Sequence, residues 1–326
     1  MTRYILAGDI GGTKTLLQLA AAESDAIDVV LQKSYASTDH EDLSAIVDTF
    51  LRDAHFDKQI AAACFAVAGP VIDGRARLTN LPWHVDANEI ASRFAIARVE
   101  LINDFAAVGL GLARLSRDDL LTLQEGRPQR HGVRAAIGAG TGLGVTFLTW
   151  SSGRYIAHAS EGGHADFAPA NDLQQRLLQH LRQRHGHVSC ERVLSGPGLI
   201  AAYEFLCVHD GYVCDIDVHS EHAAAQIAAR AGSDAESPAA RALDLFVDVY
   251  GAYAGSLALT MLASGGIYIA GGIAPKISAR LGDGRFLKAF LDKGRYAELL
   301  SKVPIHVVMN AEVGLIGAAA EAVALT

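Results

Sequence analysis

Two glycine-rich turns of the same design constrain this chain of 326 residues more than any other feature. The first lies in residues 4–17 (YILAGDIGGTKTLL) and the second in residues 135–147 (AAIGAGTGLGVTF). After the glycines of both turns, β-branched and aromatic residues continue in rough alternation, which predicts that a strand and not a helix leaves each turn. Glycines have no Cβ atom and let backbone N–H groups approach a phosphate closely. The sequence therefore predicts two phosphate-binding hairpins.

Hydroxyl and ammonium donors accompany both turns. Thr13 and Lys14 follow the glycines of the first turn, and Thr141 stands between two glycines of the second. Glycine pairs also form ordinary tight turns, so either turn taken alone favours a purely structural role. Finding both turns in the two halves of one chain favours the grip of one triphosphate from two sides.

Composition and charge narrow the class of protein. Half of the residues are hydrophobic and a fifth are charged, as in soluble globular proteins, and the length suggests two domains. The net charge of −8 argues against a nucleic acid or an anionic membrane as partner, so we expect a phosphate ligand to be held locally together with Mg²⁺. The four cysteines at 64, 190, 207 and 214 have no zinc-site spacing, which predicts a reducing cytoplasm.

Strand patterns alternate with helix patterns, which predicts an α/β protein with a mixed sheet. Helices are expected over residues 41–54, 86–94, 106–113, 173–183, 199–207, 223–231, 239–262 and 311–323, the last with Asn310 as its N-cap. Strands are expected over residues 60–67, 99–102 and 267–270. The polar segment 116–132 marks the domain boundary. The uncharged stretch 249–275 is long enough for a membrane span, but its glycine pairs predict a buried helix, a turn and a strand.

The first candidate for catalysis is a carboxylate that follows a buried strand. Asp104 comes directly after the strand expected over 99–102. A phosphoryl acceptor hydroxyl needs a base within hydrogen-bond reach, and a carboxylate at this place suits that task. Asp104 would serve equally well as the N-cap of the next helix, and its position alone leaves both roles open. Asn103 beside it carries an amide that both donates and accepts, which suits a sugar hydroxyl.

A second polar group follows the second hairpin. Glu161 and His164 flank two glycines in residues 161–167 (EGGHADF), and Glu191 follows residues 186–190 (GHVSC). Glycines next to polar side chains let a small, hydroxyl-rich ligand approach the backbone. The alternative for Glu161 is an exposed loop acid without a role, which the residues leave open. Zinc binding by these histidines is disfavoured, because no cysteine or second carboxylate has ligand spacing with them.

Taken together, these motifs resemble those of bacterial ATP-dependent glucokinases. The similarity keeps its order along nearly the whole chain and rests on residues 4–15, 101–105, 138–144, 161–169, 186–198 and 269–273. The EGGH and GHVSxER blocks are specific, whereas the hairpins alone would also suit actin-like ATPases, acetate kinases and sugar-kinase-like regulators. The resemblance implies an α/β, two-domain actin/hexokinase-like (ribonuclease H-like) fold with a cleft between domains. Residues 1–115 with 308–326 would form the small domain, and residues 116–307 the large one.

The resemblance also implies an activity, the phosphorylation of D-glucose by ATP to glucose 6-phosphate with Asp104 as general base. The other sugar hydroxyls would be held by Asn103, Glu161, His164 and Glu191. The ATP phosphates would be held by Gly8, Asp9, Ile10, Gly11, Gly12, Thr13, Lys14, Gly140, Thr141 and Gly142, with Gly271 and Gly272 bordering the adenosine. Asp9 would act on Mg²⁺ through a water molecule. The implied protein is a cytoplasmic homodimer with small-molecule substrates and no nucleic-acid or membrane partner.

Lys14 departs from this resemblance. Many members of the family have Asn there, and lysine is commoner in the related ROK group of sugar kinases and repressors. ROK members usually carry a cysteine cluster that binds zinc, whereas Cys190 stands alone here. Two alternatives stay open: a ROK-type kinase for another hexose or an N-acetylated amino sugar, and a catalytically weak sugar sensor. A sensor is disfavoured because it has no use for a base aimed at the γ-phosphate.

Overall fold

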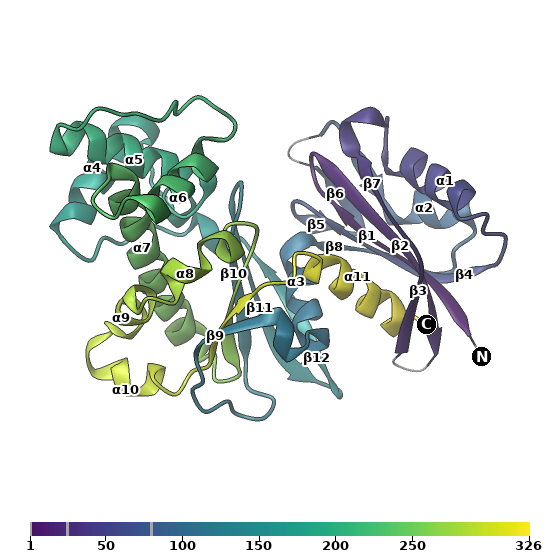
Figure 1. Cartoon of the computed structure of the whole chain (residues 1–326). Helices are drawn as coiled ribbons and strands as arrows, with labels where there is room; N and C mark the ends of the chain where they lie inside the picture. Colours follow the sequence, from purple (N-terminus) through teal and green to yellow (C-terminus); the bar gives the residue numbers. More distant parts are fainter. Residues whose placement is uncertain (1, 24–25, 79–80) are drawn as a thin grey trace. The chain divides into compact units, whose positions relative to one another are not determined.

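The computed structural model describes residues 2–23, 26–78 and 81–326, and the chain divides into two compact units (Figure 1). Unit 1 comprises Met1–Leu115, Tyr155–Ala159 and Glu312–Thr326, and unit 2 comprises Ser116–Arg154 and Ser160–Ala311. The functional domain limits expected from the sequence, 1–115 with 308–326 and 116–307, stay a prediction.

Unit 1 is built on a five-stranded sheet. Its strands lie in the order β3 (Ala26–Ala36), β2 (Lys14–Glu23), β1 (Arg3–Ile10), β4 (Ile60–Val67) and β8 (Val99–Asn103). β1, β2 and β3 pair antiparallel, whereas β4 runs parallel to β1 and β8 parallel to β4. The first glycine turn joins β1 to β2, with Ile10 opposite Thr15. The predicted strand after this turn is therefore confirmed.

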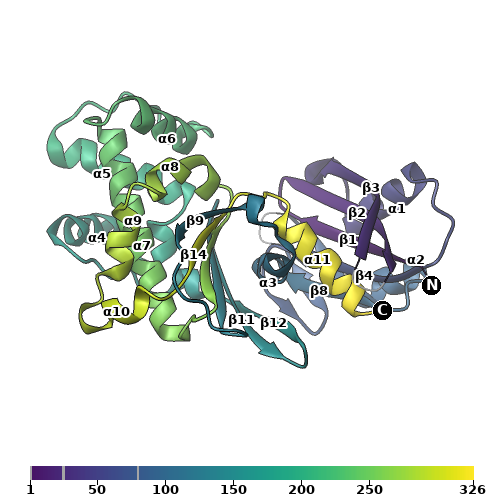
Figure 2. The same cartoon turned by 60° about the horizontal axis from the view of Figure 1, so that its bottom comes forward.

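Helices cover both faces of this sheet, because successive strand residues point to opposite sides. On one face lie α1 (Leu43–Asp53) and α2 (Ala87–Phe94), whose buried residues pack with those at alternate positions of β1. Along the other face lie α3 (Asp104–Gly111) and α11 (Val313–Ala324), as Figures 1 and 2 show. A small separate sheet contains β5 (Val71–Ile72), β6 (Arg75–Arg77) and β7 (His84–Asp86).

The small residues of α11 allow it to lie close to α3. A Cβ atom at Gly317 would fall 1.8 Å from the carbonyl oxygen of Ala107, so only glycine fits there. The predicted helix is thus confirmed, but its predicted cap is wrong. The N-cap position belongs to Glu312, whereas the Asn310 amide donates to the Asp119 carboxylate at 3.0 Å. The Asn310 side chain is therefore bonded to Asp119, 191 residues away in the chain, and does not cap the helix.

A six-stranded sheet repeats the strand order of unit 1, and its strands belong to unit 2 except the first in this order, whose residues Tyr155–Ala159 are grouped with unit 1. The order is β12 (Arg154–Ser160), β11 (Leu143–Ser151), β10 (Arg134–Ala139), β13 (Gly266–Ala270), β14 (Ile305–Val308) and β9 (Leu120–Gln124). β10 and β11 form an antiparallel hairpin, and β13 and β14 run parallel to β10 as β4 and β8 do to β1. The second glycine turn therefore has the same place in its sheet as the first, and its predicted strands are confirmed.

Helices form the rest of unit 2. They are α4 (Asp172–His185), α5 (Gly196–Asp210), α6 (Ala223–Ser233), α7 (Pro238–Met261), α8 (Ser278–Leu281), α9 (Arg285–Leu291) and α10 (Ala297–Leu300). Within the described ranges, α7 alone is long and apolar enough to cross a membrane, yet 67% of its apolar window is buried inside the protein. It is the central helix of a hydrophobic core and is followed by a turn and β13, as predicted.

Candidate functional site

The first hairpin is closed by its backbone and braced by buried hydroxyl groups. The N–H of Gly11 donates to the carbonyl of Lys14 at 3.0 Å. Behind the turn, the Ser37 hydroxyl donates to the Gly11 carbonyl at 2.8 Å and lies 2.9 Å from the Thr15 hydroxyl, with both side chains fully buried. The N–H of Ser37 also donates to the Thr13 carbonyl at 3.0 Å. Ser37, just after β3, therefore ties down the turn at three points.

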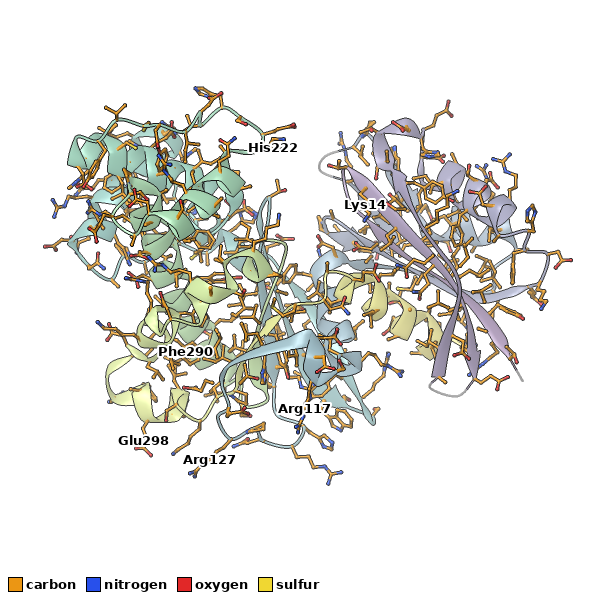
Figure 3. The ribbon with its side chains drawn as sticks, in the orientation of Figure 1. Lys14, Arg117, Arg127, His222, Phe290 and Glu298 are labelled. Carbon is orange, nitrogen blue, oxygen red and sulfur yellow. The ribbon has the colours of Figure 1, made fainter. Side chains whose placement is uncertain are left out.

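Asp9 and Lys14 place opposite charges on the two strands of this hairpin. Burial raises the pKa of Asp9, and the positive charge of Lys14 opposes that rise. The sign of the shift means that ionising Asp9 costs free energy in the folded chain, so a cation beside it would be favourable. The Lys14 side chain is exposed at the start of β2 (Figure 3).

The surroundings of Asp9 fit Mg²⁺, a cation that typically takes one or two carboxylates, several waters and substrate phosphates as ligands. Among the described residues, no group of three or more His, Cys, Asp or Glu side chains offers an all-protein metal site. One carboxylate beside a predicted phosphate-binding hairpin is consistent with that mixed coordination. On the other side, α11 approaches closely, since a Cβ atom at Gly314 would lie 3.2 Å from Asp9 Oδ2.

Asn103 and Asp104 join β8 to α3, and the helix cap is Asn103. Its Oδ1 accepts the N–H groups of Phe105 at 3.0 Å and Ala106 at 3.1 Å, so Asp104 is the first helical residue and the alternative of an Asp104 cap is wrong. Asn103 Nδ2 donates to Asp104 Oδ1 at 3.0 Å, and the N–H of Phe105 donates to the same oxygen at 2.8 Å. These two donors orient the Asp104 carboxylate.

The parallel strands bring these groups of unit 1 to one edge of the sheet. Ile10 of β1 lies beside Val67 of β4, and Val67 lies beside Asn103 of β8. The carboxyl ends of the three strands therefore meet at the same edge, where Asp9 and Asp104 stand two strands apart. Neighbouring strands are about 4.8 Å apart, so the two carboxylates share this edge without competing for one position.

The second hairpin is held by a carboxylate and a helix start. The N–H of Gly140 donates to the carbonyl of Gly142 at 2.8 Å, which closes the turn. Glu191 Oε2 accepts the N–H of Leu143 at 2.9 Å, and a Cβ atom at Gly142 would fall 2.5 Å from that oxygen. The N–H of Gly196, the first residue of α5, donates to the Gly140 carbonyl at 2.8 Å. A side chain at position 142 would therefore displace the Glu191 carboxylate from this position.

The structure brings the two predicted sugar-binding blocks together on both sides of Leu143. Glu161 and His164 are exposed, at the two ends of a 3-10 turn whose Gly163 would place a Cβ atom 2.1 Å from the Leu143 carbonyl. Glu191, on a second 3-10 turn (Cys190–Arg192), bonds the Leu143 N–H. The N–H of Cys190 donates to the Ala165 carbonyl at 2.8 Å and joins the blocks directly. Burial raises the pKa of Cys190 to about 12, so its thiol stays protonated.

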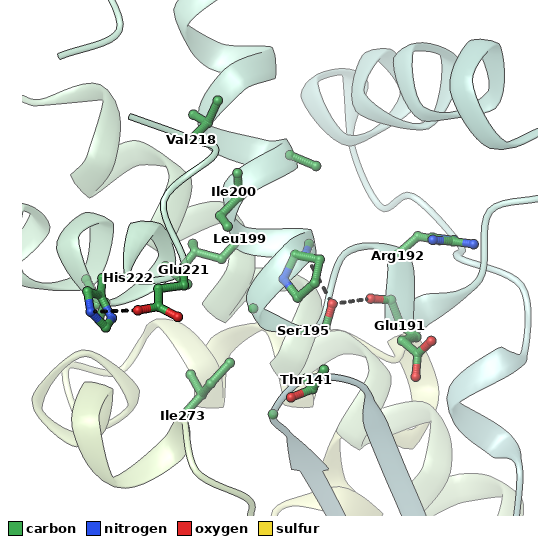
Figure 4. Close-up of a pocket in the computed structure, with 18 of the residues that line it drawn as sticks. Thr141, Glu191, Arg192, Ser195, Leu199, Ile200, Val218, Glu221, His222 and Ile273 are labelled. Carbon is green, nitrogen blue, oxygen red and sulfur yellow. Dashed lines mark hydrogen bonds and ion pairs between the residues drawn. The ribbon is translucent and has the colours of Figure 1, made fainter. Parts of the chain in front are cut away.

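A pocket of about 800 Å³ opens beside the second hairpin (Figure 4). Its lining includes Gly140, Thr141 and Gly272, three of the predicted nucleotide-binding residues. Leu199, Ile200, Val218 and Ile273 give it an apolar wall that suits a flat heteroaromatic ring, and the pocket is within the usual size range of ligand sites. At the N-terminus of α5, the N–H groups of Gly196 and Gly198 are already bonded to the Gly140 carbonyl and the Ser195 hydroxyl, and Pro197 has none.

Sequence reasoning missed the α5 and α6 walls of this pocket. One local signal was present, because Ser195 is followed by a glycine and a proline, the pattern of a helix start. The Ser195 hydroxyl accepts the N–H of Gly198 at 3.1 Å and donates to the Glu191 carbonyl at 2.8 Å. This cap connects the Glu191 turn to α5. Burial, followed by the charges of Arg192 and Arg184, lowers the pKa of His185 at the pocket rim.

Comparisons with known proteins agree over the full length of the chain. A model of the Glucokinase family matches residues 6–325. A protein named Glucokinase from Nostoc sp. (strain PCC 7120) is 45% identical over 335 aligned positions, which cover 97% of each chain. A crystal structure of glucokinase from an Antarctic psychrotroph superimposes with a TM-score of 0.86 at 33% identity and covers 98% of this chain and 99% of that one.

The ROK group is a more distant neighbour. A ROK family glucokinase from Streptomyces griseus, solved in complex with glucose and AMPPNP, has a TM-score of 0.63 at 20% identity and covers 98% of this chain and 99% of that one. At that identity the likeness extends to the fold alone. The predicted α/β fold of the actin-like ATPases is confirmed by both structures. With its family model, its relative and its fold in agreement, the chain belongs to the glucokinase family.

Proposed function

We propose that this chain transfers the γ-phosphoryl group of ATP to the 6-hydroxyl of D-glucose. The observation that carries the proposal is the match to the glucokinase family along residues 6–325, together with a relative of that name at 45% identity over 97% of both chains. The matched range spans both hairpins and all of the polar blocks of this chain. The protein is therefore an ATP-dependent glucokinase.

Asp104 acts as the general base in this reaction. As the glucose O6 forms its bond to the γ-phosphorus, the bond from phosphorus to the oxygen of the leaving ADP breaks, and Asp104 takes the proton of the 6-hydroxyl. The donors on its Oδ1, from Asn103 and Phe105, support this role because they fix the carboxylate before the substrate arrives. Asn103 contributes to the sugar site as well as to the orientation of the base.

The two hairpins hold the phosphates of ATP. Backbone N–H groups of the first turn and the ammonium of Lys14 face the transferred group, and Gly140, Thr141 and Gly142 hold the phosphates from unit 2. Asp9, through water, together with the phosphates would hold Mg²⁺, which neutralises phosphate charge when bound. The pocket beside Thr141 takes the adenosine, with Gly271 and Gly272 at its border, and its apolar wall supports that assignment.

Glucose is held by the polar blocks that the structure places around Leu143. Glu161, His164 and Glu191 accept and donate hydrogen bonds at the end of the sugar that carries the 1- and 2-hydroxyls. Glu191 then has two roles, because the same carboxylate holds the second hairpin through Leu143. This shared support couples the position of the sugar to that of the nucleotide.

We also propose that the protein is cytoplasmic and forms a homodimer. The dimer is proposed from the resemblance to the family. The net charge of −8 and the buried position of α7 are consistent with small molecules as binding partners. Light scattering on the purified chain tests the dimer, with twice the 34.4 kDa of the chain as the expected mass.

A coupled assay of the purified full chain tests the activity. With ATP and Mg²⁺ we expect glucose-dependent formation of ADP and glucose 6-phosphate, and much less turnover when ADP or polyphosphate replaces ATP. Glucose binding by calorimetry without any turnover would instead support a sugar sensor. Faster turnover of an N-acetylated amino sugar than of glucose would support a ROK-type kinase.

A further inference from the structure

One turn of α7 carries two tyrosines that support two different ligand loops. Tyr250 and Tyr253 are three residues apart, so their side chains leave neighbouring positions on one face of the helix. The Tyr253 hydroxyl donates to the carbonyl of Gly162, in the loop of Glu161 and His164, at 2.8 Å. The Tyr250 hydroxyl accepts the N–H of Ala139, the residue before the second glycine turn, at 3.2 Å. All of these residues belong to unit 2.

Tyr253 fixes the loop between the two proposed sugar-binding side chains. It bonds the carbonyl of Gly162, while the Ser160 hydroxyl accepts the N–H of the same residue at 3.0 Å. The peptide groups on both sides of Gly162 are therefore bonded to side chains. A Cβ atom at Gly162 would lie 3.2 Å from the hydroxyl oxygens of both Ser160 and Tyr253, so both side chains pack closely against this glycine. Burial raises the pKa of Tyr253, which keeps the hydroxyl protonated as a donor.

Tyr250 fixes the strand end from which the nucleotide hairpin begins. Its fully buried hydroxyl accepts the N–H of Ala139 and donates to the Ile137 carbonyl at 3.3 Å. Ala139 is the last residue of β10, and Gly140 follows it directly. The Ala139 carbonyl in turn accepts the N–H of Ile273 from the pocket wall at 3.2 Å. Tyr250 thus supports the hairpin and, through Ala139, the wall of the nucleotide pocket.

We propose that Tyr253 is a positioning residue for the sugar and Tyr250 a positioning residue for the nucleotide, so that one turn of α7 sets both binding loops. This inference rests on the proposed function, because it takes residues 161–164 as sugar ligands and residues 140–142 as phosphate ligands. Neither tyrosine touches a substrate. Each acts by holding backbone whose neighbours do, which cuts the cost of ordering the loop when the ligand binds.

The test is a crossed pair of conservative variants in the full chain, Tyr253→Phe and Tyr250→Phe. Each removes one hydroxyl and keeps the ring. We expect Tyr253→Phe to raise KM for glucose roughly two- to tenfold with KM for ATP unchanged, and Tyr250→Phe to do the reverse. Tyr203→Phe is the matched control, since the hydroxyl of that buried tyrosine of α5 bonds Asp215 at 2.8 Å instead of the backbone of either loop.

A merely structural role would give a different pattern. Lowered melting temperatures with both Michaelis constants unchanged, or with both raised together in each variant, would overturn the inference. Should Tyr253→Phe fail to fold, Ser160→Ala removes the other bond to Gly162 and must show the same sugar-selective effect. Wild-type protein without turnover would contradict the proposed function instead. In that case, calorimetry with glucose and with a non-hydrolysable ATP analogue measures the same crossed pattern in the affinities of the two variants. Loss of binding of both ligands in each variant would contradict the inference.

Discussion

The two glycine hairpins occupy equivalent places in two sheets of the same strand order, yet different groups hold them. Behind the first hairpin stands the buried hydroxyl of Ser37, which bonds the Gly11 carbonyl and Thr15. Behind the second stands the carboxylate of Glu191, with the first N–H of α5. The first turn also carries a charge of its own, Lys14, whereas the second offers only backbone and a hydroxyl.

This difference shows that the residue supporting such a turn can be purely structural or can also be a proposed ligand-binding residue. At the first hairpin the groups proposed to bind the nucleotide belong to the hairpin itself, and the Ser37 side chain that supports it is neutral and buried. At the second, the supporting residue is also a proposed sugar ligand. Changes to the first hairpin should therefore act on the nucleotide alone, whereas changes to Glu191 should act on both substrates.

The largest effect is expected at the sheet edge that the first hairpin shares with Asp104. Asp104→Asn keeps the shape and most hydrogen bonds but removes the base, so turnover should fall by ~10²–10⁴ while glucose still binds. Steady-state rates and calorimetry with glucose measure both quantities. Asp172→Asn is a matched control, because Asp172 is also the first residue of a helix that an asparagine caps. Near-normal turnover of Asp104→Asn would remove Asp104 from the mechanism.

The second largest effect is expected from Glu191→Gln, which tests the double role directly. Loss of a charged acceptor from a hydrogen bond costs about 1.5–3 kcal/mol, which corresponds to a roughly 10- to 150-fold lower kcat/KM for glucose. Because Leu143 loses its charged acceptor too, KM for ATP should rise by a smaller factor. Glu236→Gln, at an exposed position, is the control. An effect confined to one substrate would contradict the contrast between the hairpins.

A smaller effect is expected from Lys14→Ala. An exposed charge contributes up to about 1 kcal/mol to binding an anion, so KM for ATP should rise about fivefold while KM for glucose stays unchanged. Lowering the salt concentration should then reduce KM for ATP less in the variant than in the wild type, because the variant lacks this charge. Lys33→Ala, which removes an exposed lysine of the same sheet paired with Asp53, is the control. If both KM for ATP and turnover stay at their wild-type values, Lys14 is a bystander.

Local sequence patterns were sufficient for the elements that carry the site. Alternation after the glycines predicts the hairpins, and apolar spacing predicts α1, α4 and α7 to within a few residues of their observed bounds. The position of Asp104 directly after a strand was also readable, but β8 is not the buried strand expected, because it lies at the edge of its sheet with only Leu101 buried. By contrast, β3 was not expected, because its residues face solvent at most positions and lack a strand-like apolar pattern.

The supports of the site could not be read from the sequence, because they are contacts between distant segments. Ser37 reaches the first hairpin from 26 residues away, and Glu191 reaches Leu143 across 48 residues. Nothing in the local pattern of Tyr253 distinguishes it from an ordinary core tyrosine. The wrong cap at Asn310 has the same cause, since Asp119 binds its amide. Hydrophobic periodicity predicts which face of a helix or strand is buried, but it does not predict which polar group from a distant segment bonds to that element.

Glu161, His164 and Glu191 are proposed to hold glucose in a site built for its hydroxyls. Specificity constants with ATP for glucose, mannose, fructose, N-acetylglucosamine and N-acetylmannosamine test it most directly. A sugar with one hydroxyl inverted or missing leaves an acceptor unpaired at ~1–3 kcal/mol, and a 2-acetamido group would press against Glu191. We therefore predict the highest value for glucose. A higher value for any of the other four sugars would contradict the glucokinase assignment.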